Sequence, residues 1–177
     1  VQVYFRPLSS TAARPLAGTE GALYPFWSPD SKSIAFGAQG KLKKIEIAGG
    51  PAIAIADAPN LRGGTWNADG VIVFAPIPEG NLKKVSAAGG TVSDVTLVRN
   101  PSPAERDIWP AFLPDGRHFL YLARRAGANE IRVASIDTAP GSQPATKIVS
   151  GVPSQAIYSA SHILFLRDET LMAQAFD

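Results

Sequence analysis

The sequence contains no cysteine, a single methionine and two histidines, and its apolar runs are short. Without cysteine there is no disulfide scaffold, no thiolate zinc site and no thiol nucleophile. The longest apolar runs, such as Val71–Pro78, fall far below the ~20 residues that a membrane-spanning helix needs. We therefore expect no membrane contact by this segment.

An excess of one charge is also missing. The chain has 17 basic and 15 acidic residues, a net charge of +2, which is too weak for the concentrated positive field of a nucleic-acid-binding protein. Hydrophobic residues make up 45% of the chain, enough for a core and too many for a disordered chain. The chain begins at Val1 with no signal-peptide pattern, so we expect it to be part of a longer protein.

Glycine and proline, by contrast, are abundant, with 16 and 15 residues. Such a composition is usual for many short strands joined by turns. No window carries the i, i+3, i+4, i+7 apolar stripe of a long helix. The composition and the patterning together favour an all-β fold.

A turn motif recurs along the chain, in which an aromatic residue precedes a tight turn and a short apolar strand. Its copies are Trp27–Ser31, Trp66–Gly70 and Phe112–Gly116, with a degenerate copy at Tyr158–Ser161. The aspartates of the turns occupy positions 30, 69 and 115, which are 39 and 46 residues apart. A second motif, at 40–50 and 80–90, recurs in phase with the first. Two motifs with one period indicate a repeat architecture.

Four short strands fit into each period, and this is the pattern of β-propeller blades. The sequence predicts an all-β propeller of about four blades, each with four antiparallel strands. Residues 1–21 form the outer strands of an incomplete blade, 22–60, 61–104 and 105–152 form blades, and 153–177 form an incomplete last blade. Because the terminal strands do not add up to a closed ring, we expect a fragment of a larger propeller, or a chain that completes its ring through a second copy. We also expect self-association through its open blade edges.

The segment Phe26–Phe36 resembles the repeat of TolB-like, WD-related β-propellers. Four further strings are similar to the C-terminal propeller region of bacterial serine/threonine protein kinases, namely Gly18–Gly21, Arg62–Trp66, Trp109–Phe119 and Thr170–Gln174. In that family the propeller follows a kinase domain and a membrane span. The resemblance implies an extracytoplasmic sensor region, on the periplasmic or cell-surface side of a bacterium. This segment has no kinase phosphate loop and no catalytic-loop motif, so phosphoryl transfer does not reside in it.

The linkers that lead into the inner strands surround the mouth of the channel in propellers, and loops of this kind commonly carry function. From these linkers we predict five ligand-binding residues: Tyr24, Arg62, Arg106, Asp107 and Gln155. A mixed ring of arginine and carboxylate can hold a peptide, a sugar or a small anion through charge-assisted hydrogen bonds. We predict no catalytic residue, no metal site and no cofactor.

Other regular residues are interpreted as structural. The aspartates of the turns bond to nearby backbone N–H groups, and the tryptophans at 27, 66 and 109 are expected to pack between blades. His118 and His162 stand far apart in the sequence, without a nucleophile motif.

These observations favour a non-catalytic binding module, the sensor region of a membrane serine/threonine kinase, whose partner at the channel mouth is a protein or a small ligand. Two alternatives stay open. One is a periplasmic TolB-type protein-interaction scaffold, and the other is the accessory propeller of a peptidase or glycosidase.

Overall fold

The computed structural model describes residues 1–144 and 146–176, and the described chain folds into five antiparallel β-sheets. The first pairs β1 (Tyr4–Phe5) with β2 (Arg14–Pro15). The second contains β3 (Leu23–Trp27), β4 (Ser33–Ala38), β5 (Lys41–Glu46) and β6 (Ile53–Asp57), and the third β7 (Gly64–Trp66), β8 (Val71–Phe74), β9 (Lys83–Ser86) and β10 (Ser93–Asp94).

Two further sheets complete the described chain. The fourth contains β11 (Arg106–Phe112), β12 (His118–Arg125), β13 (Ala128–Ser135) and β14 (Lys147–Ser150), with a short 3₁₀ turn at Pro140–Ser142. The fifth contains β15 (Ala156–Ser159), β16 (His162–Arg167) and β17 (Thr170–Ala175). No helix in the described ranges has the length and apolar character that crossing a membrane requires.

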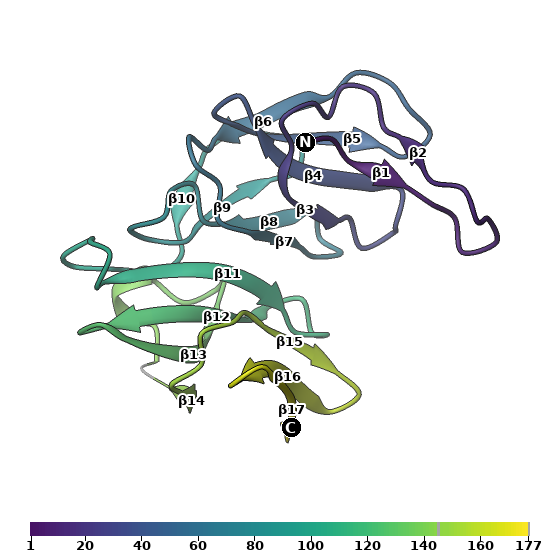
Figure 1. Ribbon diagram of the computed structural model, residues 1–177. Coiled ribbons are helices and arrows are strands. Elements are labelled where there is room, and N and C mark those ends of the chain that lie inside the picture. The colour runs from purple at the N-terminus through teal and green to yellow at the C-terminus, as the bar shows by residue number, and fades with distance from the viewer. Residues whose placement is uncertain (145, 177) are drawn as a thin grey trace.

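The four larger sheets are the blades of a propeller, which confirms the predicted fold class. In each blade the strands lie in sequence order, so the first strand is innermost and the last outermost. The innermost strands β3, β7, β11 and β15 neighbour one another in turn, and the blades fan out from them (Figure 1). We call blades 1 to 4 the sheets that begin with β3, β7, β11 and β15. The leading end is the end at which these inner strands begin, and the turn end is the opposite one.

Tight turns at the turn end join the first two strands of each blade. In blade 1 the Asp30 carboxylate accepts a hydrogen bond of 2.6 Å from the Ser28 hydroxyl and one of 3.1 Å from the Lys32 N–H. The Ser28 hydrogen bond is the largest cause of the lowered pKa of the Asp30 carboxyl. In blade 3 Asp115 accepts hydrogen bonds from the N–H groups of Arg117 and His118. These two aspartates therefore have the structural role that their turn positions predict.

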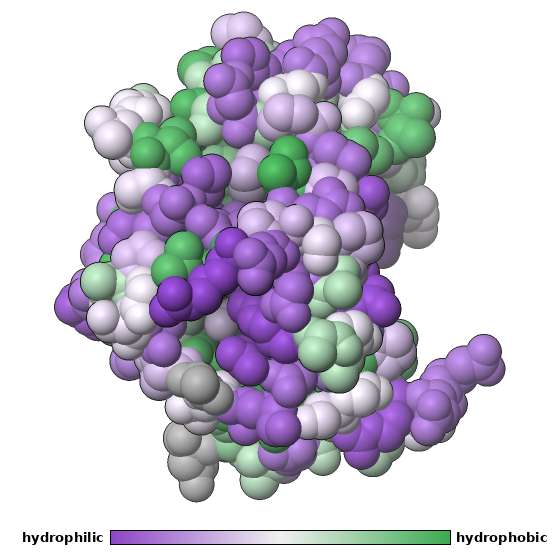
Figure 2. Space-filling model, turned by 90° about the vertical axis from the view of Figure 1, so that its left-hand side faces the viewer, coloured by the Kyte–Doolittle hydropathy of each residue, from purple (hydrophilic) through white to green (hydrophobic). Residues whose placement is uncertain are grey.

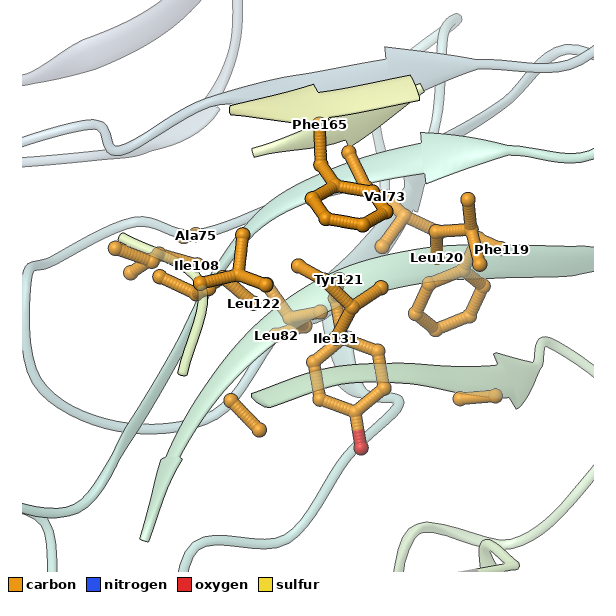
Figure 3. Packing of buried hydrophobic residues seen from close by; sticks show 14 of the residues in the cluster. Val73, Ala75, Leu82, Ile108, Phe119, Leu120, Tyr121, Leu122, Ile131 and Phe165 are labelled. Carbon is orange, nitrogen blue, oxygen red and sulfur yellow. The ribbon is translucent and has the colours of Figure 1, made fainter. Parts of the chain in front are cut away.

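The core lies between neighbouring blades, because each sheet buries a face against the next. The second strand of each blade carries an aromatic residue at the same place, and Phe36, Phe74 and Tyr121 are exposed by only 0%, 0% and 4%. Figure 3 shows how Val73, Leu122 and Phe165, from blades 2, 3 and 4, gather in one cluster. A continuous core of this kind makes each blade depend on its neighbours.

The last blade leaves apolar side chains exposed. In the described part of the chain no strand pairs with the far edge of β17, and Leu166 and Leu171 are 47% and 67% exposed. An open edge of this kind can template pairing with another strand. Self-association through this edge stays a prediction.

A close contact between blades 1 and 2 gives a test of this packing. A Cβ atom on Gly37, in β4, would lie 2.7 Å from the Cβ of buried Leu61, whereas one on Gly141 would meet nothing closer than 3.6 Å. We expect Gly37→Ala to lower the free energy of unfolding by about 1–3 kcal/mol through overpacking. The control Gly141→Ala should change it by less than ~0.5 kcal/mol. Urea unfolding of both variants checks this, and equal midpoints would contradict the packing described.

Candidate functional site

One repeated position, in the inner strand or directly before it, lies on the channel side of every blade. Tyr24, Gly63 and Trp109 each stand six residues before the aspartate of the turn that follows, and Gln155 stands three before Tyr158 just as Tyr24 stands three before Trp27. Three of the four have a left-handed backbone, with φ of 48° at Tyr24, 93° at Gly63 and 54° at Trp109. Such angles are unusual for bulky residues.

The left-handed residues interrupt the pairing of the inner strands. The register of β3 against β4 shifts between Leu23 and Phe26, and the register of β11 against β12 shifts between Ile108 and Ala111. β-bulges of this type change the direction of a side chain and strengthen the local twist. A proline follows both aromatic residues, at 25 and 110, and proline is tolerated at bulges and on sheet edges. The bulges thereby let the rings leave the pleat of their own sheet.

The inner strands of all four blades enclose a hollow of about 200 Å³. Its lining includes the repeated position of every blade: Tyr24, Gly63, Trp109 and Gln155, together with Phe26 and Ile157. Tyr24, Phe26 and Trp109 are all partly exposed. The hollow therefore presents aromatic surface from residues far apart in the sequence.

Two glycines of β7 and its approach allow the rings to sit there. A Cβ atom on Gly63 would lie 3.0 Å from Cδ1 of Trp109, and one on Gly64 would lie 2.4 Å from Cε1 of Phe26. Blade 2 thus contributes bare backbone to the hollow, and the rings of blades 1 and 3 close over it. The backbone N–H of Trp109 also donates to the carbonyl of Arg62 at 3.1 Å, which ties β11 to blade 2.

Arg62 lies beside the hollow and is held by Tyr24. Its Nη1 donates to the Tyr24 hydroxyl at 2.8 Å, and the guanidinium carbon is 5.8 Å from the centroid of the Tyr24 ring. The pair combines a hydrogen bond with a cation–π contact. Arg62 appears in no ion pair of the described residues.

The structure brings together three of the five residues predicted to bind a ligand. Tyr24 and Gln155 line the hollow, and Arg62 adjoins it. Arg106 and Asp107 lie outside the lining, at the start of β11. The ligand-binding role of all five stays a prediction.

Trp109 has a second role besides the one that the sequence predicts. It packs between blades as expected, because it borders the core and lies against Gly63 of blade 2. It also occupies the repeated position of Tyr24 and lines the channel hollow. The spacing to the aspartate of the turn, six residues rather than three, is the signal that distinguishes it.

Asp107 belongs instead to a polar cavity of about 140 Å³ between blades 2 and 3. It is 1% exposed, and its Oδ1 accepts a hydrogen bond from Nη2 of Arg125 at 2.6 Å. Burial raises the pKa of the Asp107 carboxyl, and Arg125 offsets part of that rise. Tyr121 lines the same cavity, and burial together with the nearby Asp107 raises the pKa of its phenol to about 12. The cavity combines paired charges with a neutral phenol.

Within residues 1–144 and 146–176 no three His, Cys, Asp or Glu side chains are grouped closely enough to hold a metal ion.

Comparison with known proteins supports the fold. No family model and no curated protein matches the sequence. Among solved structures, the chain superposes on a putative TolB from Agrobacterium tumefaciens with a TM-score of 0.69 and 22% identity, over 92% of this chain and 60% of that one. TolB from Acinetobacter baumannii gives a TM-score of 0.68 at 14% identity, over 98% of this chain and 46% of that one. A chain of a nidogen–laminin complex gives a TM-score of 0.70 at 9% identity, over 99% of this chain and 68% of that one.

These similarities define the class of protein. The chain is a β-propeller segment with TolB-like structural neighbours, and it spans only about 60% of the length of the first of them.

Tyr121 gives a test of the cavity between blades 2 and 3. A phenol pKa of about 12 in the folded state exceeds the ordinary value of 10.0. The stability that it contributes is therefore complete below pH 10 and is lost as the pH rises from 10 to about 12. The full loss is about 2–3 kcal/mol.

Tyr121→Phe should remove this part of the pH dependence of the free energy of unfolding and leave the part that comes from the other tyrosines. Urea unfolding at several pH values between about 8 and 11.5, a range that brackets the ordinary phenol pKa, measures the difference. Parallel stability curves for the two proteins would show that the Tyr121 phenol is not buried as described.

Proposed function

We propose that this chain is a non-catalytic binding module that takes a segment of a partner protein at the channel hollow. The observation that supports the proposal is the convergence of Tyr24, Gly63, Trp109 and Gln155 on one hollow. Each blade contributes the same repeat position, so the hollow belongs to the assembled propeller and not to any one blade.

The size of the hollow favours part of a ligand over a whole small molecule. Pockets that enclose a drug-sized ligand or a cofactor measure about 300–1,000 Å³, and this hollow measures about 200 Å³. One apolar side chain of an extended peptide fits that volume. Aromatic residues and arginine are the types that carry most of the binding energy in protein interfaces, and Trp109, Tyr24 and Arg62 supply both types.

A substitution at Trp109 tests the proposal, with Trp27 as a matched control. Trp27 is 48% exposed and contacts Phe5 outside the hollow. Peptides are selected from a displayed random library on the immobilised wild-type chain, and the affinity of the selected peptides is then measured for each variant. Trp109→Ala should weaken binding by about tenfold or more, as expected for loss of an aromatic anchor. Trp27→Ala should leave it within about twofold.

Melting temperatures of both variants provide the control for folding. Binding that survives Trp109→Ala, or that is lost with Trp27→Ala, would place the peptide site elsewhere on the propeller.

The setting that we propose for this module is the extracytoplasmic region of a bacterial membrane serine/threonine kinase. The support is the likeness of the strings at 62–66, 109–119 and 170–174 to the propeller regions of such kinases. In that setting, partner binding at the channel would be the sensed event, and catalysis would lie in another part of the protein.

Sequencing the intact reading frame tests this setting. We expect a kinase domain followed by one membrane span on the N-terminal side of Val1. A signal peptide followed only by further blades would favour a TolB-type scaffold, and a peptidase or glycosidase domain would favour an accessory propeller. Either of these two results would overturn the kinase setting and leave the binding proposal to its own test.

A further inference from the structure

At the leading end of blade 3, charged side chains point to both faces of the sheet, because successive residues of a strand point to opposite faces. Glu105, Asp107 and Arg125 lie on one side of the sheet, and Arg125 pairs with both carboxylates. Arg125 approaches the Asp107 carboxylate at 2.6 Å and the Glu105 carboxylate at 3.9 Å, and Glu105 also accepts a hydrogen bond of 2.7 Å from the N–H of Ala126. Both acidic residues that flank Arg106 in the sequence are therefore engaged away from it.

The opposite side of the same strands carries two arginines without such partners. Arg106 of β11 is directly across from Arg124 of β12, and Arg124 is directly across from Asn129 of β13. Residues opposite one another in antiparallel strands share a face, and like charges in that arrangement are destabilising. In the ranges that the structure describes, neither arginine has a carboxylate within 4.0 Å.

Hydrogen bonding around the pair is also incomplete. Nε of Arg106 and Oδ1 of Asn129 are buried and have no partner among the described residues, and a buried unpartnered polar atom is costly. Arg124 donates from Nε to the carbonyl of Gly127 at 3.1 Å, which fixes one side of its guanidinium. Two adjacent cations with unfilled donor capacity have the character of an anion site.

We infer that Arg106 and Arg124 together bind a carboxylate of the peptide segment that occupies the channel hollow. This inference rests on the proposed function and specifies the class of partner, an acidic peptide. A guanidinium matches a carboxylate through two parallel hydrogen bonds, and a carboxylate between the two arginines removes their mutual repulsion.

The geometry sets the spacing in the peptide. Arg106 precedes Trp109 by three residues in β11, a distance of roughly 10 Å at the rise of an extended strand. The anchoring side chain in the hollow and the acidic residue are therefore about three peptide residues apart. Figure 2 views the side of the molecule on which β11 begins, and hydrophilic residues cover most of its middle. A charged contact is in keeping with that surface.

Selection of peptides distinguishes this inference from the proposed function. A displayed random heptapeptide library is selected in parallel on the wild-type chain, on Arg106→Gln/Arg124→Gln and on Arg6→Gln, an exposed arginine in the loop after β1. We expect aspartate and glutamate to be enriched about three residues from an apolar position on wild type and Arg6→Gln. On the double variant the apolar preference should persist and the acidic one disappear.

Each other result has a defined meaning. Apolar enrichment without acidic enrichment on wild type would overturn the acidic-peptide inference and leave the hollow as the binding site. Absence of any selected peptide on wild type would contradict the proposed function itself. Affinities of the selected peptides should fall about tenfold on the double variant, as expected for loss of a charge-assisted contact.

A second measurement needs no peptide. Since the two arginines repel each other, Arg124→Gln should raise the melting temperature of the free chain at low ionic strength, and added salt should diminish the difference. A difference in melting temperature between Arg124→Gln and wild type that does not change with salt concentration would show that the two arginines do not repel each other and would overturn the inference.

Discussion

The left-handed turn of the backbone at Tyr24, Gly63 and Trp109, in blades 1 to 3, is the constraint on which the channel surface depends. Tyr24 and Trp109 adopt it despite bulky side chains, at a cost of order 1–3 kcal/mol each. Packing between blades holds them there, because Trp109 closes over Gly63 and Phe26 over Gly64. The strain and the hollow are therefore parts of one arrangement, in which each blade positions the rings of its neighbours.

The same dependence between blades governs the charged residues. Asp107 is buried against blade 2 and neutralised by Arg125, so the carboxylate of that linker has a structural partner. Tyr121 replaces the phenylalanine of the other blades and carries a hydroxyl into the cavity beside them. The two arginines on the other face of blade 3, Arg106 and Arg124, have no carboxylate partner among the described residues.

Local sequence determines much of the fold but only part of the candidate site. The turn motif at Trp27–Ser31 and its copies fixes the blades, since turn chemistry and strand propensity act over a few residues. The place of Tyr24 and Gln155 at the channel follows from the same period. The burial of Asp107 does not, because its partner Arg125 comes 18 residues later across a strand pairing whose register has to be known. The role of Trp109 depends on a bulge, and bulky aromatic residues give no sequence signal for positive φ.

The most direct test of binding at the channel is to map a selected peptide onto the ¹⁵N-labelled chain by amide chemical shifts. We expect the largest changes at the inner strands, at Gly63, Gly64 and Ala111, with smaller changes at the start of β11. Changes concentrated on the outer strands β6, β10 and β14, with the inner strands unaffected, would contradict the claim that this propeller binds its partner at the channel.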